Sequence, residues 1–202
     1  MAGDSFMKKS LLLLLLLLLS ILSLLLMSCG EREIDLGKLQ NRNDTYYEVN
    51  QTKGFSGIAT SKYPNGQLKY KETFKDGKFD GPAERYYGNG QLQSKGTFKN
   101  GKTDGPWESY YENGKPKLKA TFKNGILDGP VESYYENGQT ENKGTFNNGK
   151  KDGLWEHRYE DGYLKEKGTY KDGQREGPWE FYDESAKLKE KETYENGEII
   201  RH

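Results

Sequence analysis

The residues best suited to chemistry are few in this 202-residue chain, which contains two histidines and one cysteine. They are His157, His202 and Cys29. His157 falls in a repeated position otherwise held by serine, arginine or phenylalanine, so we interpret it as a surface residue of a strand. No nucleophile can be matched with a histidine base, and the spacing of His and Cys does not suit zinc. We therefore expect no catalytic residue, no metal ligand and no cofactor.

Carboxylates are abundant, but they recur at fixed positions. Asp-Gly pairs begin at Asp80, Asp104, Asp128 and Asp152. A calcium loop needs several carboxylates close together, whereas ordinary turn chemistry explains one Asp per turn. A glycosidase needs a pair of carboxylates, and the candidates for it form one repeated column. This column contains Glu84, Glu108, Glu132, Glu156 and Glu180. Because an active site is a singular feature, we interpret residues that occur in every unit as structural.

The N-terminal residues indicate a covalent role for Cys29. A pair of lysines precedes the apolar run 11–27, and small residues follow it. This order is typical of a secretory signal peptide, and the run is short for the alternative, a membrane-spanning helix. The segment Leu26-Met27-Ser28-Cys29 resembles the lipobox of bacterial lipoproteins. The resemblance implies removal of residues 1–28 and a lipid on Cys29 that anchors the protein to a membrane.

The residues after Cys29 suggest an address and a tether. Gly30 follows the cysteine, where an Asp in a Gram-negative lipoprotein would favour the inner membrane, so we expect the outer membrane in such a cell. Met7 is an alternative start of the chain. Residues 29–53 are polar without a sustained period, and we predict a flexible tether there. The repeat domain is expected over 54–202.

Composition narrows the class of protein. Lys+Arg 31 and Asp+Glu 31 give a formal net charge of zero, whereas nucleic-acid binders usually have a basic excess, so we expect no nucleic-acid partner. Hydrophobic residues make up only 32%, which disfavours a large aliphatic core. Aromatic residues make up 13%, too many for a simply disordered chain. We therefore expect a fold whose packing is aromatic.

A period of 24 residues runs through the chain from residue 57 onward. Internal repetition of this kind is the signature of repeat architectures. One glycine column contains Gly57, Gly81, Gly105, Gly129, Gly153 and Gly177. Threonine recurs at Thr73, Thr97, Thr121, Thr145, Thr169 and Thr193. The six copies predict an all-β fold, an elongated solenoid of consecutive antiparallel β-hairpins.

Each unit is expected to be one hairpin. In the third copy, Asn113-Gly114 separates strand-forming residues 107–111 from a second run, 115–122. Asn-Gly between two such runs favours a two-residue type I′ turn, because both central residues need positive φ. The other junction, over 124–129, is expected to be a longer turn.

The expected turn fixes a register for every hairpin. It places Tyr111 opposite Pro116 and Trp107 opposite the small residue Ala120. The five charged pairs that it predicts are Glu84–Lys95, Glu108–Lys119, Glu132–Lys143, Glu156–Lys167 and Glu180–Lys191. All five join opposite charges, as cross-strand pairing favours. A large aromatic ring that packs over a small residue stabilises a strand at a glycine. Trp155 is likewise expected opposite Gly168.

Alternation along the strands sorts the side chains onto two faces. One face, interpreted as an aromatic core, is expected to carry Trp107, Tyr111, Leu118 and Phe122 with their equivalents. The other, interpreted as solvent-exposed, is expected to carry Glu108, Tyr110, Lys117, Lys119 and Thr121. A tyrosine row on this second face, our candidate binding face, contains Tyr86, Tyr110, Tyr134 and Tyr182 and is interrupted by Arg158.

The segment Asp-Gly-Pro-Trp-Glu-Ser-Tyr-Tyr-Glu-Asn-Gly at 104–114 resembles the MORN-repeat family. It is most similar to the bacterial MORN-variant repeats, whose members are often described as YwqK-type antitoxins. The resemblance covers 57–200, with departures at Ile58-Ala59 in the first copy and at Ala186 in the last. It implies a curved run of hairpins with a binding role rather than catalysis.

Three functions follow as hypotheses. The first is a non-enzymatic scaffold for protein–protein interaction, anchored by lipid at the bacterial cell envelope. The second is a cell-wall or polysaccharide binder, because sugars stack on aromatic rings such as those of the tyrosine row. The third is an antitoxin-like inhibitor of a toxin, which the family resemblance implies.

Overall fold

The computed structural model describes residues 32–200, and these form one long sheet and one small one. The N-terminal elements are β1 (Glu33–Asp35), the 3₁₀ helix η1 (Leu36–Lys38), β2 (Leu39–Arg42) and β3 (Thr45–Glu48). The repeat strands are β4 (Gly57–Lys62), β5 (Leu68–Lys75), β6 (Lys78–Tyr86), β7 (Leu92–Lys99), β8 (Lys102–Tyr110), β9 (Pro116–Lys123), β10 (Ile126–Tyr134), β11 (Thr140–Asn147), β12 (Lys150–Arg158), β13 (Leu164–Lys171), β14 (Gln174–Tyr182), β15 (Leu188–Glu195) and β16 (Glu198–Ile199).

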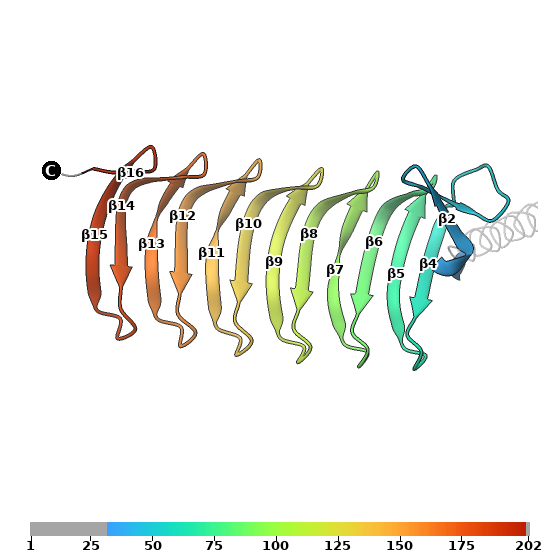
Figure 1. Cartoon of the computed structure of the whole chain (residues 1–202), viewed down its shortest axis with the longest axis horizontal. Coiled ribbons are helices and arrows are strands. Elements are labelled where there is room, and N and C mark those ends of the chain that lie inside the picture. The colour runs from blue at the N-terminus through green and yellow to red at the C-terminus, as the bar shows by residue number, and fades with distance from the viewer. Residues whose placement is uncertain (1–31, 201–202) are drawn as a thin grey trace, which may run out of the picture. The chain divides into compact units, whose positions relative to one another are not determined.

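The long sheet confirms the predicted fold class. From β4 to β16 every strand pairs with the next one along the chain, and β1 lies beside β4 at the other end (Figure 1). All the consecutive pairs are antiparallel, so each repeat is one hairpin. Neighbouring strands lie about 4.8 Å apart, so each repeat advances the sheet by about 9.6 Å.

The predicted charge register is confirmed in all five hairpins. Glu108 pairs with Lys119, and the equivalent residues pair in the other four. Trp107 pairs with Ala120, as expected. The pairing of Tyr111 with Pro116 is wrong, because Tyr110 takes that place and the ladder shifts by one residue next to Ser109.

The two kinds of turn are the reverse of those predicted. At Asn124-Gly125 both residues have positive φ, 53° and 85°, and the flanking residues pair directly, so this is the two-residue turn. At Asn113-Gly114 only the glycine has positive φ, 83°. There the Tyr111 N–H donates to the Lys115 carbonyl at 2.9 Å, which closes a three-residue loop. The bulge near Ser109 offsets the extra loop residue and restores the predicted register.

The two faces, which we call the aromatic face and the charged face, carry the residues that alternation predicts, with one exception. The bulge opposite Ser109 leaves Lys117 without a partner in the ladder, and its ammonium lies 5.4 Å from the ring centroid of Tyr111. The prediction that Lys117 and Tyr111 lie on opposite faces is therefore wrong.

The aromatic face holds the tryptophan column and the phenylalanine column, in which Trp155, Trp179 and Phe74 are buried. Rings of neighbouring strands meet edge to face, as Phe146 and Trp155 do at 5.2 Å between centroids. The core is therefore a single layer of aromatic contacts along the sheet.

Each tryptophan ring packs on a glycine, but of the preceding strand rather than of its own hairpin. A Cβ atom added to Gly144 would lie 2.2 Å from the ring of Trp155. The same relation joins Gly96 with Trp107 and Gly168 with Trp179. The predicted pairing of Trp155 with Gly168 is confirmed in the ladder, while the Trp155 ring lies against Gly144 of the preceding strand. The consequence is that each ring joins two repeats.

Constant polar residues also join successive repeats. The tyrosine hydroxyls donate to a backbone carbonyl of the next unit in the pairs Tyr63–Tyr86, Tyr87–Tyr110, Tyr111–Tyr134, Tyr135–Arg158 and Tyr159–Tyr182. The turn asparagines donate to the next unit in the pairs Asn65–Gly88, Asn89–Glu112, Asn113–Glu136 and Asn137–Glu160. The repeats are thus stabilised by nearest-neighbour contacts, as expected for a solenoid.

The prediction of a flexible tether over 29–53 is wrong for residues 33–48, which form regular elements. Strand β1 pairs in parallel with β4, and β2 and β3 form a separate hairpin. Tyr46 of β3 contacts the rings of Phe74 and Phe79 at 5.1 and 5.3 Å, beside the buried Phe55. These residues cover the first end of the aromatic face, as a terminal cap of a solenoid does. The folded domain therefore begins at Glu33 rather than at residue 54.

Candidate interaction surfaces

The tyrosine row lies on the charged face, and its hydroxyl groups are engaged there. Tyr134 donates to the carboxylate of Glu132 at 2.6 Å. The other members do the same in the pairs Tyr86–Glu84, Tyr110–Glu108 and Tyr182–Glu180. Burial, followed by the bond to glutamate, raises the pKa of Tyr134 to about 12. Arg158 takes the tyrosine's place in the fifth repeat and contacts Glu156 at 2.7 Å.

A row of alternating glutamates and lysines runs beside the tyrosines across the sheet. Glu180 lies between Lys167 and Lys191, with 2.8 Å to each ammonium. Hydrogen bonds from these two lysines lower the pKa of Glu180 to about 2. Lys119 is exposed and, within residues 32–200, has no carboxylate within the 4.0 Å of an ion pair. Its ammonium lies 5.8 Å from the ring centroid of Tyr134.

An apolar row lies on the same face, two residues before the glutamates along the strands. It consists of Ile58, Pro82, Pro106, Pro130, Leu154 and Pro178. All but Ile58 are exposed, and Leu154 retains 59% of its accessible surface. The sequence reasoning above missed this row, although the Asp-Gly-Pro triplets at 24-residue spacing were its signal.

A break in the ladder separates successive members of the apolar row. The pairing of β7 with β8 passes from Gly96–Trp107 to Phe98–Thr103, so Asp104, Gly105 and Pro106 face Thr97 alone. Proline has no N–H to donate, and Gly105 has φ 101°, so this stretch bulges out of the sheet. The same break separates β9 from β10 beside Pro130.

Two similar cavities occupy the charged face beside these breaks. A cavity of about 280 Å³ is lined by Pro82, Thr97 and Pro106. The next, of about 290 Å³, is lined by Pro106, Thr121 and Pro130. Glutamates and lysines of the charged row line both of them, so each cavity has apolar walls and a charged rim. Pro106 and Glu108 line both cavities.

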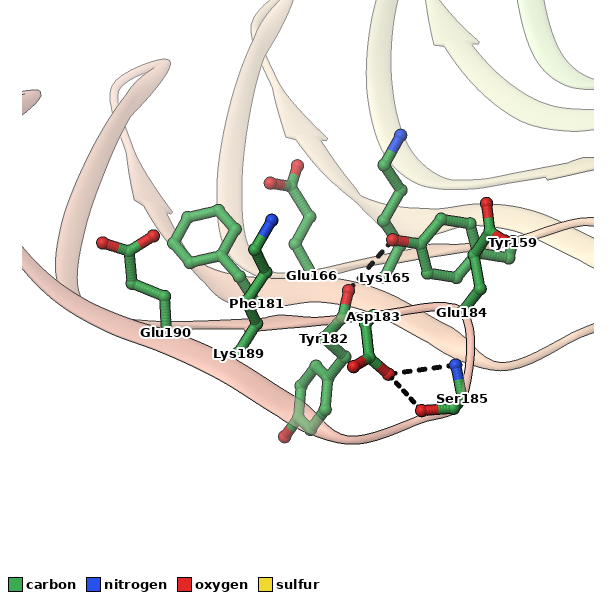
Figure 2. Close-up of a pocket in the computed structure, with 10 residues that line it drawn as sticks. All are labelled: Tyr159, Lys165, Glu166, Phe181, Tyr182, Asp183, Glu184, Ser185, Lys189 and Glu190. Atoms are coloured by element: carbon green, nitrogen blue, oxygen red, sulfur yellow. Dashed lines mark hydrogen bonds between the residues drawn. The ribbon is translucent and has the colours of Figure 1, made fainter.

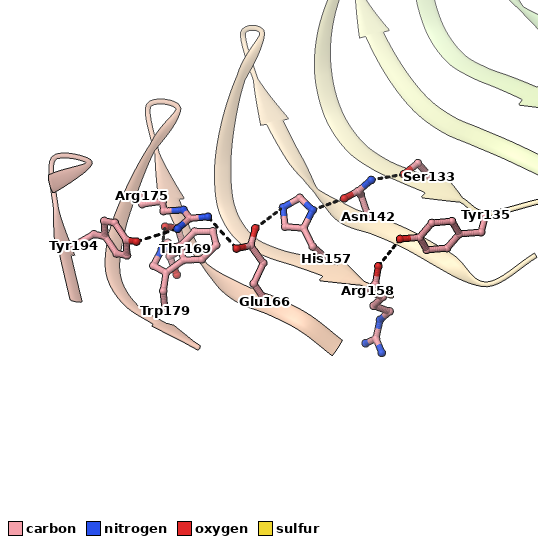
Figure 3. Close-up of polar contacts among 10 residues, drawn as sticks. All are labelled: Ser133, Tyr135, Asn142, His157, Arg158, Glu166, Thr169, Arg175, Trp179 and Tyr194. Carbon is pink, nitrogen blue, oxygen red and sulfur yellow. Dashed lines mark hydrogen bonds and ion pairs between the residues drawn. The ribbon is translucent and has the colours of Figure 1, made fainter. Parts of the chain in front are cut away.

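The aromatic face carries a polar chain in its C-terminal half that no earlier repeat matches. It runs from Ser133 through Asn142, His157, Glu166 and Arg175 to Tyr194 (Figure 3). Five successive strand pairs therefore contribute to one line of contacts. Sequence analysis missed it because these six residues stand in four different repeat columns.

His157 lies in the middle of this chain and was predicted to be a surface residue. It is half-buried, with its ring stacked on Trp155 at 5.9 Å between centroids. Its Nδ1 contacts the Asn142 amide, and its Nε2 lies 3.7 Å from the Glu166 carboxylate. Burial, followed by the charge of Lys151, lowers the pKa of His157. The arrangement favours a neutral ring held by packing.

Arg175 lies near the C-terminal end of this polar chain, between Glu166 and Tyr194. Its guanidinium lies 4.2 Å from the ring centroid of Trp179 and donates to Glu166 and to the Tyr194 hydroxyl, each at 2.9 Å. A pocket of about 520 Å³ lies nearby, where Phe181 stands between Glu166 and Glu190 (Figure 2). Of the carboxylates that line this pocket, Glu166 is bonded to Arg175 and Asp183 to Ser185, and Glu184 and Glu190 are exposed.

Two of the four Asp-Gly aspartates, Asp80 and Asp104, have a turn role. The carboxylate of Asp104 accepts the backbone N–H of Asn124 at 3.0 Å, and Asp80 holds Asn100 in the same way. Each one thus fixes the two-residue turn of its own repeat. The structure shows no group of three or more His, Cys, Asp or Glu side chains arranged for a metal ion within 32–200.

Two predicted features fall elsewhere. Cys29 with its signal segment and His202 lie outside the described residues. Within 32–200 the structure contains no helix long and apolar enough to cross a membrane.

The fold and its surfaces define a repeat protein whose hairpins follow one another in a single sheet and whose exposed rows extend over several repeats. The family model described as "MORN repeat variant" matches 56–76, 79–100, 103–124, 127–148, 151–172 and 175–196, more than half of the chain. The protein therefore belongs to the MORN-repeat variant family. Comparison with curated protein sequences finds no significant match.

Proposed function

We propose that the protein is a lipid-anchored, non-enzymatic scaffold of the bacterial cell envelope, which binds another protein along its charged face. One observation carries this proposal. The constant polar side chains are used within the sheet, whereas the apolar row Pro82, Pro106 and Pro130 stays exposed beside two cavities. Exposed apolar rows rimmed by polar residues are typical of protein-binding surfaces.

The membrane anchor is the lipid on Cys29. Metabolic labelling with a fatty-acid analogue, followed by membrane fractionation, tests it. The wild type is expected to carry label and to sediment with membranes, and Cys29→Ala is expected to lose both. An unlabelled, soluble wild type would contradict the anchor.

Chemical cross-linking of intact envelopes tests the scaffold. Purification of the wild type is expected to enrich a partner protein, and Pro106→Glu is expected to lose it because a charge then stands between the two cavities. Pro178→Glu is the matched control, with the same change three repeats further along the row and away from both cavities. If no protein is enriched by the wild type, the scaffold proposal fails.

The two other hypotheses give different outcomes in the same purification. An antitoxin-like role predicts that the partner is a toxin whose activity falls when the complex forms. A polysaccharide-binding role predicts co-sedimentation with cell-wall polymer that is lost in Tyr110→Ala with Tyr134→Ala. The engagement of both hydroxyls with glutamate favours a structural role for the tyrosine row over sugar binding.

A further inference from the structure

The periodicity of the cavities restricts the conformation of a ligand that fills both. Their walls Pro82, Pro106 and Pro130 stand on β6, β8 and β10, which are two strand spacings apart. Two spacings amount to about 9.4–9.8 Å. A linear ligand that runs across the strands must therefore present equivalent groups at about this interval.

One peptide conformation has this interval. A polyproline II helix has three residues per turn and rises about 3.1 Å per residue, so every third side chain recurs at about 9.3 Å on one side. In a β-strand, side chains on one face recur at about 6.6 Å, and an α-helix completes one turn in about 5.4 Å. Neither of these two periods matches the spacing of the cavities.

The chemistry of the cavities agrees with such a peptide. Their walls are proline rings and threonine side chains, and the stems of Lys95, Lys119 and Lys143 border them. These surfaces suit compact apolar residues. A polyproline II backbone has no internal hydrogen bonds, so its carbonyl groups are free to accept from the lysine ammonium groups at the rim.

Lys119 adds a charge preference. It borders the cavity between Pro106 and Pro130, and the Glu108 carboxylate across the ladder is already bonded by Lys95 and Tyr110. Among the described residues Lys119 itself forms no ion pair. An acidic side chain on the ligand complements it.

We propose that the two cavities flanking Pro106 bind a proline-rich segment of a partner protein in the polyproline II conformation, with anchor residues three apart and a carboxylate against Lys119. This inference rests on the proposed scaffold function and specifies the chemistry of its partner. The segment would run along the length of the sheet, perpendicular to the strands.

The test is the affinity of the purified repeat protein for a fluorescent peptide of four Pro-Pro-Glu triplets, measured by fluorescence polarisation. An alanine-rich helical peptide and an alternating Val-Thr peptide of equal length and charge are the controls for conformation. The triplet peptide is expected to bind at least about tenfold more tightly than either. Equal binding of the three peptides, or preference for a control, would overturn the proposal.

Two variant pairs locate the site. Pro106→Glu is expected to weaken binding by about tenfold through like-charge repulsion, and Pro178→Glu is expected to leave it unchanged. Lys119→Gln is expected to lower the affinity for the Pro-Pro-Glu peptide about threefold and to leave the affinity for a Pro-Pro-Gln peptide unchanged. Lys71→Gln, in the same column two repeats earlier, is its control. Equal effects of either variant and its control would overturn the assignment to these cavities.

The envelope cross-linking separates failure of this inference from failure of the proposed function. If no triplet peptide binds but a partner is still captured and lost in Pro106→Glu, the scaffold stands and the peptide class is wrong. If the wild type captures no partner and binds no peptide, both proposals fall.

Discussion

The two faces of the sheet follow opposite rules. On the charged face, the glutamate, lysine and tyrosine columns repeat with few exceptions, so the surface is nearly the same every 24 residues. On the aromatic face, only the phenylalanine column is regular, because the tryptophan column also contains alanine and valine, and the remaining residues change from repeat to repeat. The first half of that face has Phe79 and Leu127 where the second half has Lys151 and Arg175. A periodic face suits a periodic ligand, whereas a changing face gives each repeat its own packing.

The largest difference between the faces is expected from truncation of adjacent residues. Trp179 is buried on the aromatic face, and Pro178 is exposed on the charged face. Trp179→Ala is expected to cost about 3–5 kcal/mol of unfolding free energy, because it leaves a cavity between two repeats. Pro178→Ala is expected to change it by less than about 0.5 kcal/mol. Urea unfolding followed by circular dichroism measures both, and similar losses would contradict the division of the faces.

A second prediction concerns size compensation on the aromatic face. Gly144→Ala brings a methyl group onto the Trp155 ring and is expected to cost about 1–3 kcal/mol. The preceding repeat combines Ala120 with Val131, a smaller residue in the tryptophan column. Gly144→Ala combined with Trp155→Val is therefore expected to be more stable than the sum of the two single losses. A double-mutant cycle with zero coupling would show that the ring and the glycine act independently.

A smaller effect is expected from the tyrosine hydroxyls. Tyr111 donates to the carbonyl of Tyr134 in the next repeat, and Tyr111→Phe is expected to cost about 1 kcal/mol because that acceptor loses its partner. Tyr110→Phe is expected to cost less, because the solvated carboxylate of Glu108 keeps its contact with Lys95. Thermal unfolding of the two variants gives the order, and the reverse order would show that the Tyr110–Glu108 bond within one repeat contributes more than the Tyr111 bond between repeats.

The smallest expected effects are on the pH dependence of stability, which differs between the two faces. The pKa of Glu180 is lowered by its lysines, so its stabilising contribution is present above about pH 4.5 and is lost as the pH falls toward 2. The pKa of His157 is lowered by burial, so the neutral ring stabilises the fold above about pH 6.5, and stability falls as the pH drops below that value. Glu180→Gln should flatten only the lower window, and His157→Ser only the upper one. Melting temperatures measured from about pH 2 to about pH 8 check both.

If His157→Ser leaves the upper window unchanged, the polar chain of the aromatic face does not depend on a neutral ring. Added salt should weaken the Glu180 effect more than the His157 effect, because the Glu180 contacts are exposed and screened. Equal sensitivity to salt would contradict the difference in burial.

Much of the fold could be predicted from the sequence because the repeat columns encode it. The register derived from the expected turn is correct, although that turn has a different length, since the bulge near Ser109 offsets the extra residue. The two turns could not be told apart because both contain a residue pair Asn-Gly. What distinguishes them is the Asp104 carboxylate on the backbone of Asn124, a contact between residues 20 positions apart.

The remaining features depend on contacts that no period reveals. The N-terminal cap uses scattered apolar residues, such as Ile34, Leu39 and Tyr46, whose common role is to cover Phe74. The apolar row on the charged face was visible as Asp-Gly-Pro triplets, but the cavities beside it arise from the bulge that proline and glycine impose on the ladder. The tyrosine row was placed on the correct face, but its bonds to glutamate appear only in three dimensions.

The most direct test of the central claim, that the charged face binds a partner protein, is site-specific photo-cross-linking in intact bacteria. A photo-reactive residue replaces Thr121 on the charged face in one strain and Ser109 on the aromatic face in another. The account predicts one cross-linked partner from position 121, lost when Pro106→Glu is added, and none from position 109. Cross-links from position 109 alone would contradict it and would make the aromatic face the binding surface.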